Sequence, residues 1–165
     1  MRFTILSFML LLSSTSAFAQ SEARPLPRFT VYDAGGVPVR SAAVAPAGRS
    51  TLVFVKPSCR SCGQLLGALA RLELPTLATQ LVLVIQAPVQ DAAAFATRDL
   101  PAELQSVRWF ADVDASAWNA MGLKGVPVLV AVENAQIAWT YSGAPARALL
   151  DSLMRTWLVP NGGAR

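Results

Sequence analysis

The chain contains no histidine among its 165 residues, and this absence removes several kinds of site. Nucleophile pairs of the serine–histidine or cysteine–histidine type need an imidazole as the base, so none can form. Structural zinc sites normally use four soft ligands, and only the two cysteines are present to supply them. Histidine-assisted nucleophilic catalysis and structural zinc are therefore excluded, although two thiolates could still hold copper(I).

Charged residues are few, at 15% of the chain. The 14 lysines and arginines exceed the 10 aspartates and glutamates, for a formal net charge of +4. The basic residues are scattered and form no run along the sequence. Proteins that bind nucleic acid gather such residues on one face or along one helix, so we expect no nucleic-acid partner.

Long hydrophobic runs are also lacking. Residues 3–12 form an apolar stretch of about ten residues, where a membrane span needs roughly 20. Met1-Arg2 gives this stretch a positive start, and the small residues that follow it end in Ala17-Phe18-Ala19. This order is typical of a secretory signal peptide cleaved after Ala19, and the alternative is an uncleaved inner-membrane anchor. We therefore predict a signal peptide over residues 1–19 and export to the periplasm.

The rest of the chain alternates strand-like and helix-like patterns. Apolar residues make up 53% of the sequence, enough for a core without disulfide staples. Alternating strands and helices indicate helices packed on a mixed sheet, which is an α/β fold. We predict one domain over residues 29–159, after an extended lead-in at 20–28 and before a flexible tail at 160–165. The predicted strands cover residues 29–32, 37–39, 50–55, 80–85, 107–110, 126–132 and 136–141, and the predicted helices cover residues 63–72, 91–98, 114–121 and 144–158.

Local signals add detail to these elements. Gly35 and Gly36 predict a hairpin turn, and Pro38 just after it predicts an edge strand. Asp91 is expected to cap the helix that begins there. Residues 41–49 are rich in alanine, proline and glycine and are expected to form a loop.

The C-terminal part of the chain gives further signals. A turn is expected at Glu133-Asn134, between the last two strands. The final helix is expected to use one apolar face, made of Leu149, Leu150, Leu153, Met154 and Trp157. The four tryptophans fall within strand or helix patterns, so we expect packing in the core or at its rim rather than a ligand-binding box: Trp109, Trp118, Trp139 and Trp157.

The only two cysteines, Cys59 and Cys62, lie between the strand 50–55 and the helix that follows it. At such a junction the first sulfur lies over free amide groups of the helix N-terminus, and their field favours the reactive thiolate. Lys56 and Arg60 would lower the pKa of the Cys59 thiol further, unless they are ordinary solvated charges. A bond between cysteines so close in sequence constrains little of the unfolded chain. We therefore predict a redox-active dithiol, with a passive disulfide or a metal site such as copper(I) as alternatives.

At this point the chain resembles the thioredoxin-like proteins, and within them the periplasmic thiol–disulfide oxidoreductases of the TlpA/ResA type. Leu52–Cys62 carries the dithiol motif, and Ala120–Pro127 is similar to the family's Tyr-Gly-Val-x-Gly-x-Pro segment. A hairpin over residues 128–143 and a final helix follow. The hairpin at 29–39 looks like the N-terminal addition of that subgroup. The resemblance implies a thioredoxin-like fold, with a mixed central sheet, flanking helices and an N-terminal β-hairpin extension.

The resemblance also implies roles for single residues. Cys59 would attack a client disulfide, and Cys62 would then resolve the mixed disulfide. Pro127 would follow a cis peptide bond, where a trans proline at the start of a strand would otherwise be expected. The backbone of Val126 would then pair with an extended client segment. No cofactor is expected beyond the Cys59–Cys62 disulfide, and no metal.

The chain departs from the family pattern near the dithiol. Val53 stands where thioredoxin has a buried acid, and Ser58 replaces a tryptophan. No acid follows Cys62 closely, so water, Asp112 or Asp114 would have to accept its proton.

The predicted function is that of an exported thiol–disulfide oxidoreductase that reduces specific client proteins with cysteine pairs, as in cytochrome c maturation or another assembly role. Because the periplasm is kept oxidising, a reductase there needs a membrane dithiol electron donor as a partner. The Lys-Pro-Ser-Cys-x-x-Cys form is also similar to the thioredoxin-like accessory protein of methylamine utilisation, which would serve a single client. A disulfide oxidase or isomerase, and a non-catalytic carrier of a client or of copper(I), are the alternatives.

Overall fold

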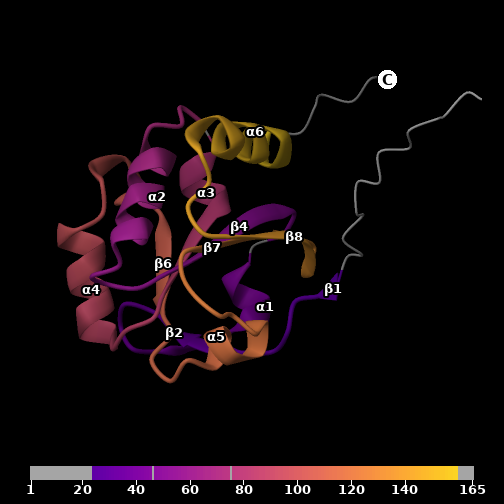
Figure 1. The fold of residues 1–165 in the computed structure, drawn as a ribbon. Coiled ribbons are helices and arrows are strands. Elements are labelled where there is room, and N and C mark those ends of the chain that lie inside the picture. Colours follow the sequence, from indigo (N-terminus) through magenta and orange to yellow (C-terminus); the bar gives the residue numbers. More distant parts are fainter. Residues whose placement is uncertain (1–23, 46, 75, 160–165) are drawn as a thin grey trace, which may run out of the picture.

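A computed structural model describes residues 24–45, 47–74 and 76–159 (Figure 1). The predicted signal peptide and the predicted tail lie outside these residues. The strands are β1 (Arg24–Pro25), β2 (Thr30–Tyr32), β3 (Pro38–Arg40), β4 (Arg49–Val55), β5 (Leu81–Ile85), β6 (Arg108–Ala111), β7 (Val128–Glu133) and β8 (Gln136–Ser142). The helices are α1 (Ser41–Val44), α2 (Arg60–Ala70), α3 (Leu77–Gln80), α4 (Val89–Arg98), the 3₁₀ turn η1 (Ala102–Leu104), α5 (Ser116–Met121) and α6 (Arg147–Leu158).

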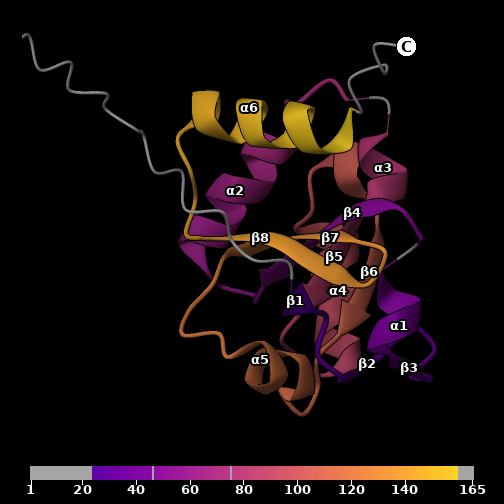
Figure 2. The same cartoon turned by 90° about the vertical axis from the view of Figure 1, so that its right-hand side faces the viewer.

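The strands form one mixed sheet in the order β1-β8-β7-β4-β5-β6-β2-β3. At its centre β4 pairs in parallel with β5 and antiparallel with β7, so that Val53 lies opposite both Leu83 and Leu129. The residues of β5 are all buried, as a strand covered on both faces requires. Helices cover both faces of the sheet (Figure 2), which confirms the predicted α/β class.

Alternate residues of the central strands face two separate cores, because successive side chains of a strand point to opposite faces. Val53 and Val55 lie in the core beneath α2, α3, α4 and α6, here called the α2 face. Leu52 and Phe54 lie in the core shared with α1, α5 and β2, here called the α5 face. The sheet therefore separates the two groups of helices. Figures 1 and 2 show α2, α3 and α6 above it and α1 and α5 below it.

The hairpin of β2 and β3 confirms the predicted N-terminal extension. Asp33 Oδ1 accepts hydrogen bonds from the N–H groups of Gly35 and Val37, both at 2.9 Å. Gly36 has a φ of 76°, a conformation that glycine adopts without strain. β3 is the last strand of the sheet, so Pro38 lies at an edge as predicted.

Several predicted details were wrong. α4 begins at Val89, directly after Pro88, so Asp91 lies in the first turn and is not the cap. Part of the predicted loop 41–49 forms the short helix α1. The last helix begins at Arg147, because the residue before Pro145 is disfavoured in helical conformation.

Three further differences concern the last helix, the hairpin before it and the N-terminal lead-in. Leu149 is 43% exposed and lies outside the apolar face that the sequence assigned to it. The turn after β7 is at Asn134 and Ala135, which both have positive φ, rather than at Glu133. The two-residue strand β1, which pairs with the start of β8, was not predicted. The other predicted elements begin and end within three residues of the observed bounds.

Candidate active site

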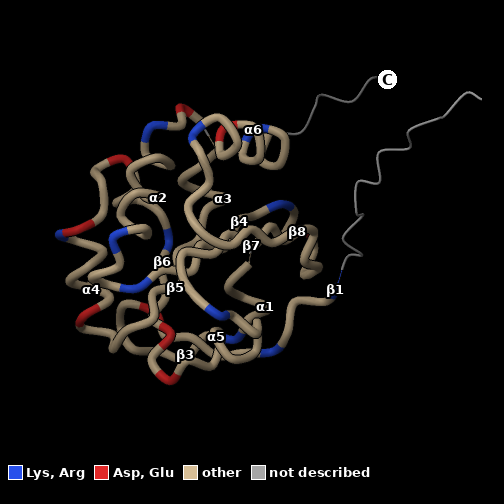
Figure 3. Tube along the Cα trace, viewed as in Figure 1, with Lys and Arg blue, Asp and Glu red and all other residues tan. Residues whose placement is uncertain are grey.

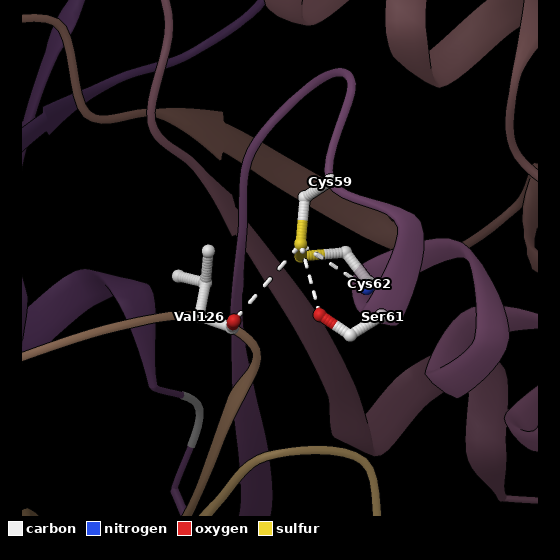
Figure 4. The surroundings of a disulfide bond; sticks show 4 residues. All are labelled: Cys59, Ser61, Cys62 and Val126. Atoms are coloured by element: carbon white, nitrogen blue, oxygen red, sulfur yellow. Dashed lines mark hydrogen bonds between the residues drawn. A yellow bond between two sulfur atoms is a disulfide. The ribbon is translucent and has the colours of Figure 1, made fainter.

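Cys59 and Cys62 are joined by a disulfide at the start of α2 (Figure 4). The helix begins here because its apolar residues Leu65, Leu66 and Leu69 repeat at helical spacing and are buried on the α2 face. Cys59 is the N-cap, and its Sγ accepts the N–H of Cys62 at 3.2 Å. The sulfur therefore occupies the position where a helix places its free amide groups.

The two cysteines differ in access. Cys62 is fully buried, whereas Cys59 is half-buried at the surface of the same core. An incoming sulfur atom can therefore reach Cys59 directly, while Cys62 is shielded by the protein. This difference agrees with the sequence-based order, in which Cys59 is the more exposed of the pair.

Cys59 Sγ has two further neighbours, which Figure 4 shows beside the disulfide. The Ser61 Oγ lies 3.4 Å away, and since the oxidised sulfur carries no hydrogen, the hydroxyl is the donor. The carbonyl oxygen of Val126 lies 4.0 Å away, from a segment 67 residues later in the chain. Sequence reasoning identified Val126 but missed Ser61, whose only signal is its position between the two cysteines.

The Val126–Pro127 peptide bond is cis, as predicted. The carbonyl of Pro127 accepts the N–H of Gly143 at 2.8 Å, which fixes the end of the loop that joins α5 to β7. Before it, the N–H groups of Lys124, Gly125 and Val126 make no hydrogen bond to any other described residue. This segment therefore offers free N–H groups to a bound molecule, and it comes close to the disulfide at Val126.

Lys56 and Arg60 both have exposed side chains. They lie at the same end of α2 as the disulfide, and neither forms an ion pair within residues 24–45, 47–74 and 76–159. The structure therefore places their charge near the site without a direct bond to either sulfur.

Asp112 and Asp114 accept hydrogen bonds from backbone N–H groups at the start of α5. The buried Asp112 accepts the N–H groups of Ala117 at 3.0 Å and Trp118 at 2.9 Å. Burial raises the pKa of Asp112 above its ordinary value, and the two backbone hydrogen bonds only partly oppose this effect. Asp114 Oδ1 accepts the N–H of Ser116 at 3.1 Å.

No carboxylate of the described residues forms a hydrogen bond with Cys62. Val53, which stands where thioredoxin has a buried acid, lies in the same core as Cys62 and offers no carboxylate there. The part of the chain that the structure describes also holds no group of three or more cysteines and carboxylates that could bind a metal. Within it, none of the helices has the length and apolar character needed to cross a membrane.

Comparison with known proteins gives a clear result for the fold. No protein-family model matches the chain, and no curated protein does. Among solved structures, a putative thiol:disulfide interchange protein DsbE from Chlorobium tepidum matches with a TM-score of 0.64 and 19% identity, over 80% of this chain and 94% of that one. A putative thioredoxin from Neisseria meningitidis matches with a TM-score of 0.63 and 18% identity, over 84% and 93% of the two chains.

A secreted Mycobacterium tuberculosis disulfide oxidoreductase, homologous to Escherichia coli DsbE, is also similar. Its TM-score is 0.59 at 17% identity, over 75% of this chain and 92% of that chain. At such low identity these likenesses concern the fold and not the activity. They show that the chain has the thioredoxin-like fold that thiol:disulfide interchange proteins share, as its sequence motifs predicted.

Proposed function

We propose that this protein is an exported thiol–disulfide oxidoreductase that reduces disulfides of selected client proteins. The observation that carries the proposal is the half-buried Cys59 at the start of α2, next to the backbone of Val126, whose N–H has no partner among the described residues. This arrangement gives a client a reactive sulfur and a backbone edge in the same place.

The reduced Cys59 begins the reaction as a thiolate, which the free amides at the start of α2 favour. It attacks one sulfur of the client disulfide, and a bond forms between Cys59 and the client as the second client sulfur leaves as a thiolate. The Cys62 thiolate then attacks Cys59 Sγ and releases the first client sulfur. Two electrons pass to the client, and the protein keeps the Cys59–Cys62 disulfide.

Val126 would hold the client during these steps. Its N–H and carbonyl groups can pair with an extended segment as a strand pairs with a sheet edge. Ser61 would stabilise charge on Cys59 by donating the hydrogen bond that it already makes to the sulfur. Cys62 must lose a proton before it attacks, and water is the acceptor that we propose, because Asp112 and Asp114 are engaged at α5.

The oxidised protein has to be reduced before each new turnover. If the chain is exported as its first 19 residues predict, it works in a compartment kept oxidising, so electrons must cross the inner membrane. We therefore propose a membrane dithiol protein as the electron donor. The pair itself is the redox group, and the proposed cycle uses no other cofactor.

The experiment that tests this direction is the reduction potential of the pair, measured against a dithiothreitol or glutathione series. A value near or below about −250 mV supports a reductase. A value near about −120 mV would make the protein an oxidant. No exchange at all would leave a carrier or binding module.

A trapping experiment tests the order of attack. In the Cys62→Ala variant, the mixed disulfide with a client cannot be resolved, so covalent complexes should accumulate and disappear on reduction. The Cys59→Ala variant is the matched control and should trap none, since the remaining sulfur is buried. Equal trapping by both variants would contradict the assigned roles.

A further inference from the structure

Two grooves of different charge are lined by residues close to the disulfide. Val126, whose carbonyl oxygen lies 4.0 Å from Cys59 Sγ, lines one of them, and Pro57, two residues before Cys59, lines the other. Charged residues of both signs are spread over the molecule (Figure 3), so a groove lined by charges of a single sign differs from the rest of the protein. The first, here called the loop groove, has a volume of about 420 Å³ and runs beside the Val126–Pro127 bond. Residues of β1, the loop after α5 and β8 line it, among them Arg24, Lys124, Val126, Pro127, Thr140 and Ser142.

The loop groove is basic. Arg24 and Lys124 are the charged residues in its lining, and no carboxylate is among the described residues that line it. The hydroxyls of Thr140 and Ser142 add hydrogen-bond donors, as do the N–H groups of Lys124 and Gly125, which have no partner in the described part of the chain. A groove with positive charge and many donors is complementary to a negatively charged chain.

The second groove, here called the α4 groove, has a volume of about 390 Å³ and is lined by Pro57 together with residues of α4 and its flanking loops. Its charged lining residues are Asp91, Asp99 and Arg98, so carboxylates outnumber cations. An acidic segment that extends from Cys59 in this direction would meet like charge. The two grooves therefore give the two flanks of a bound client different electrostatic surroundings.

We infer that the preferred clients carry acidic residues on one flank of the attacked cysteine, and that this flank lies in the loop groove. The inference rests on the proposed function, because it takes Cys59 as the atom that joins the client. Antiparallel pairing with Val126 directs the client residues that follow the paired one toward Lys124, and parallel pairing directs the preceding ones there. The charge contacts raise the rate of association and add a modest stabilisation of the complex.

The test uses the reduced full-length protein and a set of synthetic peptides, each with one disulfide in an extended neutral sequence. One peptide has two glutamates before the cysteine, one has two glutamates after it, and two further peptides have lysines at those places. The expected result is that one glutamate peptide is reduced about two- to tenfold faster than its lysine counterpart at low salt. This difference should shrink at high salt, where exposed charges are screened.

Variants connect this preference to the groove. Lys124→Glu should remove or reverse the ratio of the two rates, and Arg24→Gln should lower it. Arg147→Gln is the matched control, because Arg147 is an exposed cation on α6, on the other face of the sheet, and its ratio should equal that of the wild type.

Equal rates for glutamate and lysine peptides on both flanks, with normal reduction of the neutral peptide, would overturn the inference and leave the proposed function intact. A ratio that Lys124→Glu and Arg24→Gln both leave unchanged would overturn it as well. If no peptide is reduced, including the neutral one, the proposed function and the inference fall together.

Discussion

The two faces of the sheet carry different shares of the site. The α2 face holds the larger core, to which four helices contribute, and Cys62 is part of it. The α5 face holds a smaller core beneath two short helices and the hairpin, and the loop with Val126 leads from it to β7. The reacting sulfurs are thus anchored in the thicker layer, while the backbone that faces them comes from the thinner one. Five predictions follow from this comparison, from the largest expected effect to the smallest.

The largest effect is expected from cavities in the two cores. Leu66 is 1% exposed on the α2 face, and Leu66→Ala should lower the free energy of unfolding by about 3 kcal/mol. Met121 is 6% exposed at the edge of the α5 face, and Met121→Ala should cost about 2 kcal/mol. Urea unfolding of the oxidised protein measures both. Leu149→Ala is the control and should change little, and a greater cost at Met121 would contradict the division.

The next largest effect is expected at Asp112, which holds the start of α5. Asp112→Ala leaves the N–H groups of Ala117 and Trp118 without their acceptor, so we expect a loss of about 1 to 2 kcal/mol in urea unfolding. Asp114→Ala removes one exposed hydrogen bond and should cost less.

Asp112 also makes the free energy of unfolding depend on pH. Because the pKa of Asp112 is raised in the folded state, the folded protein binds more protons than the unfolded one above about pH 4. Its contribution to stability is therefore fully present below that pH and is lost as the pH rises through the raised pKa. The cost of Asp112→Ala should be larger at pH 4 than at pH 7, and a cost that grows with pH would contradict this assignment.

A smaller effect is expected at Arg49, where β4 contacts α6 on the α2 face. Arg49 pairs with Glu133 at 3.0 Å and lies 5.0 Å from the centre of the Trp157 ring. The side chains of Arg49 and Glu133 are 35% and 43% exposed, so water screens the ion pair. We therefore expect Arg49→Gln to lower the free energy of unfolding by about 0.5 to 1 kcal/mol. Arg155→Gln breaks the ion pair with Asp151, which has no aromatic contact among the described residues, and serves as the control. A cost at Arg155 as large as at Arg49 would show that the aromatic contact contributes nothing.

The smallest effect concerns the charges near the disulfide. In the reduced protein, Lys56→Gln and Arg60→Gln should each slow the alkylation of Cys59 by iodoacetamide at pH 7 by about twofold, because less positive charge faces the thiolate. Arg71 lies at the opposite end of α2, and Arg71→Gln should leave the rate unchanged. Unchanged rates in the first two variants would identify both residues as ordinary solvated charges.

The features that the sequence predicted are those set by local patterns. The apolar runs of β4 and β5 identify the centre of the sheet, since only a strand covered on both faces has such a run. The spacing of Cys59 and Cys62 between a strand and a helix predicts their place at a helix start. The cis bond before Pro127, in contrast, was expected only from the resemblance of its segment to the thioredoxin-like proteins.

The features that the sequence did not predict depend on contacts between distant segments. β1 has two residues and is a strand only because it pairs with Ile137 and Gln136. The cap that Asp112 provides depends on the path of the chain after β6, and the loop groove joins Arg24 to residues about a hundred positions later. Local patterns carry no information about such pairings.

Cys59 is both the reacting residue and the N-cap of α2, so a change in its redox state acts on the start of this helix. Oxidation and folding are therefore linked in a thermodynamic cycle. Oxidation of the folded pair, unfolding of each redox form and oxidation of the unfolded pair form a closed loop whose free energies sum to zero. The difference in unfolding free energy between the oxidised and reduced proteins therefore equals the shift in redox preference that folding imposes on the pair. Two unfolding curves, one for the oxidised and one for the reduced protein, would therefore report how far folding moves the reduction potential of the pair from its value in the unfolded chain.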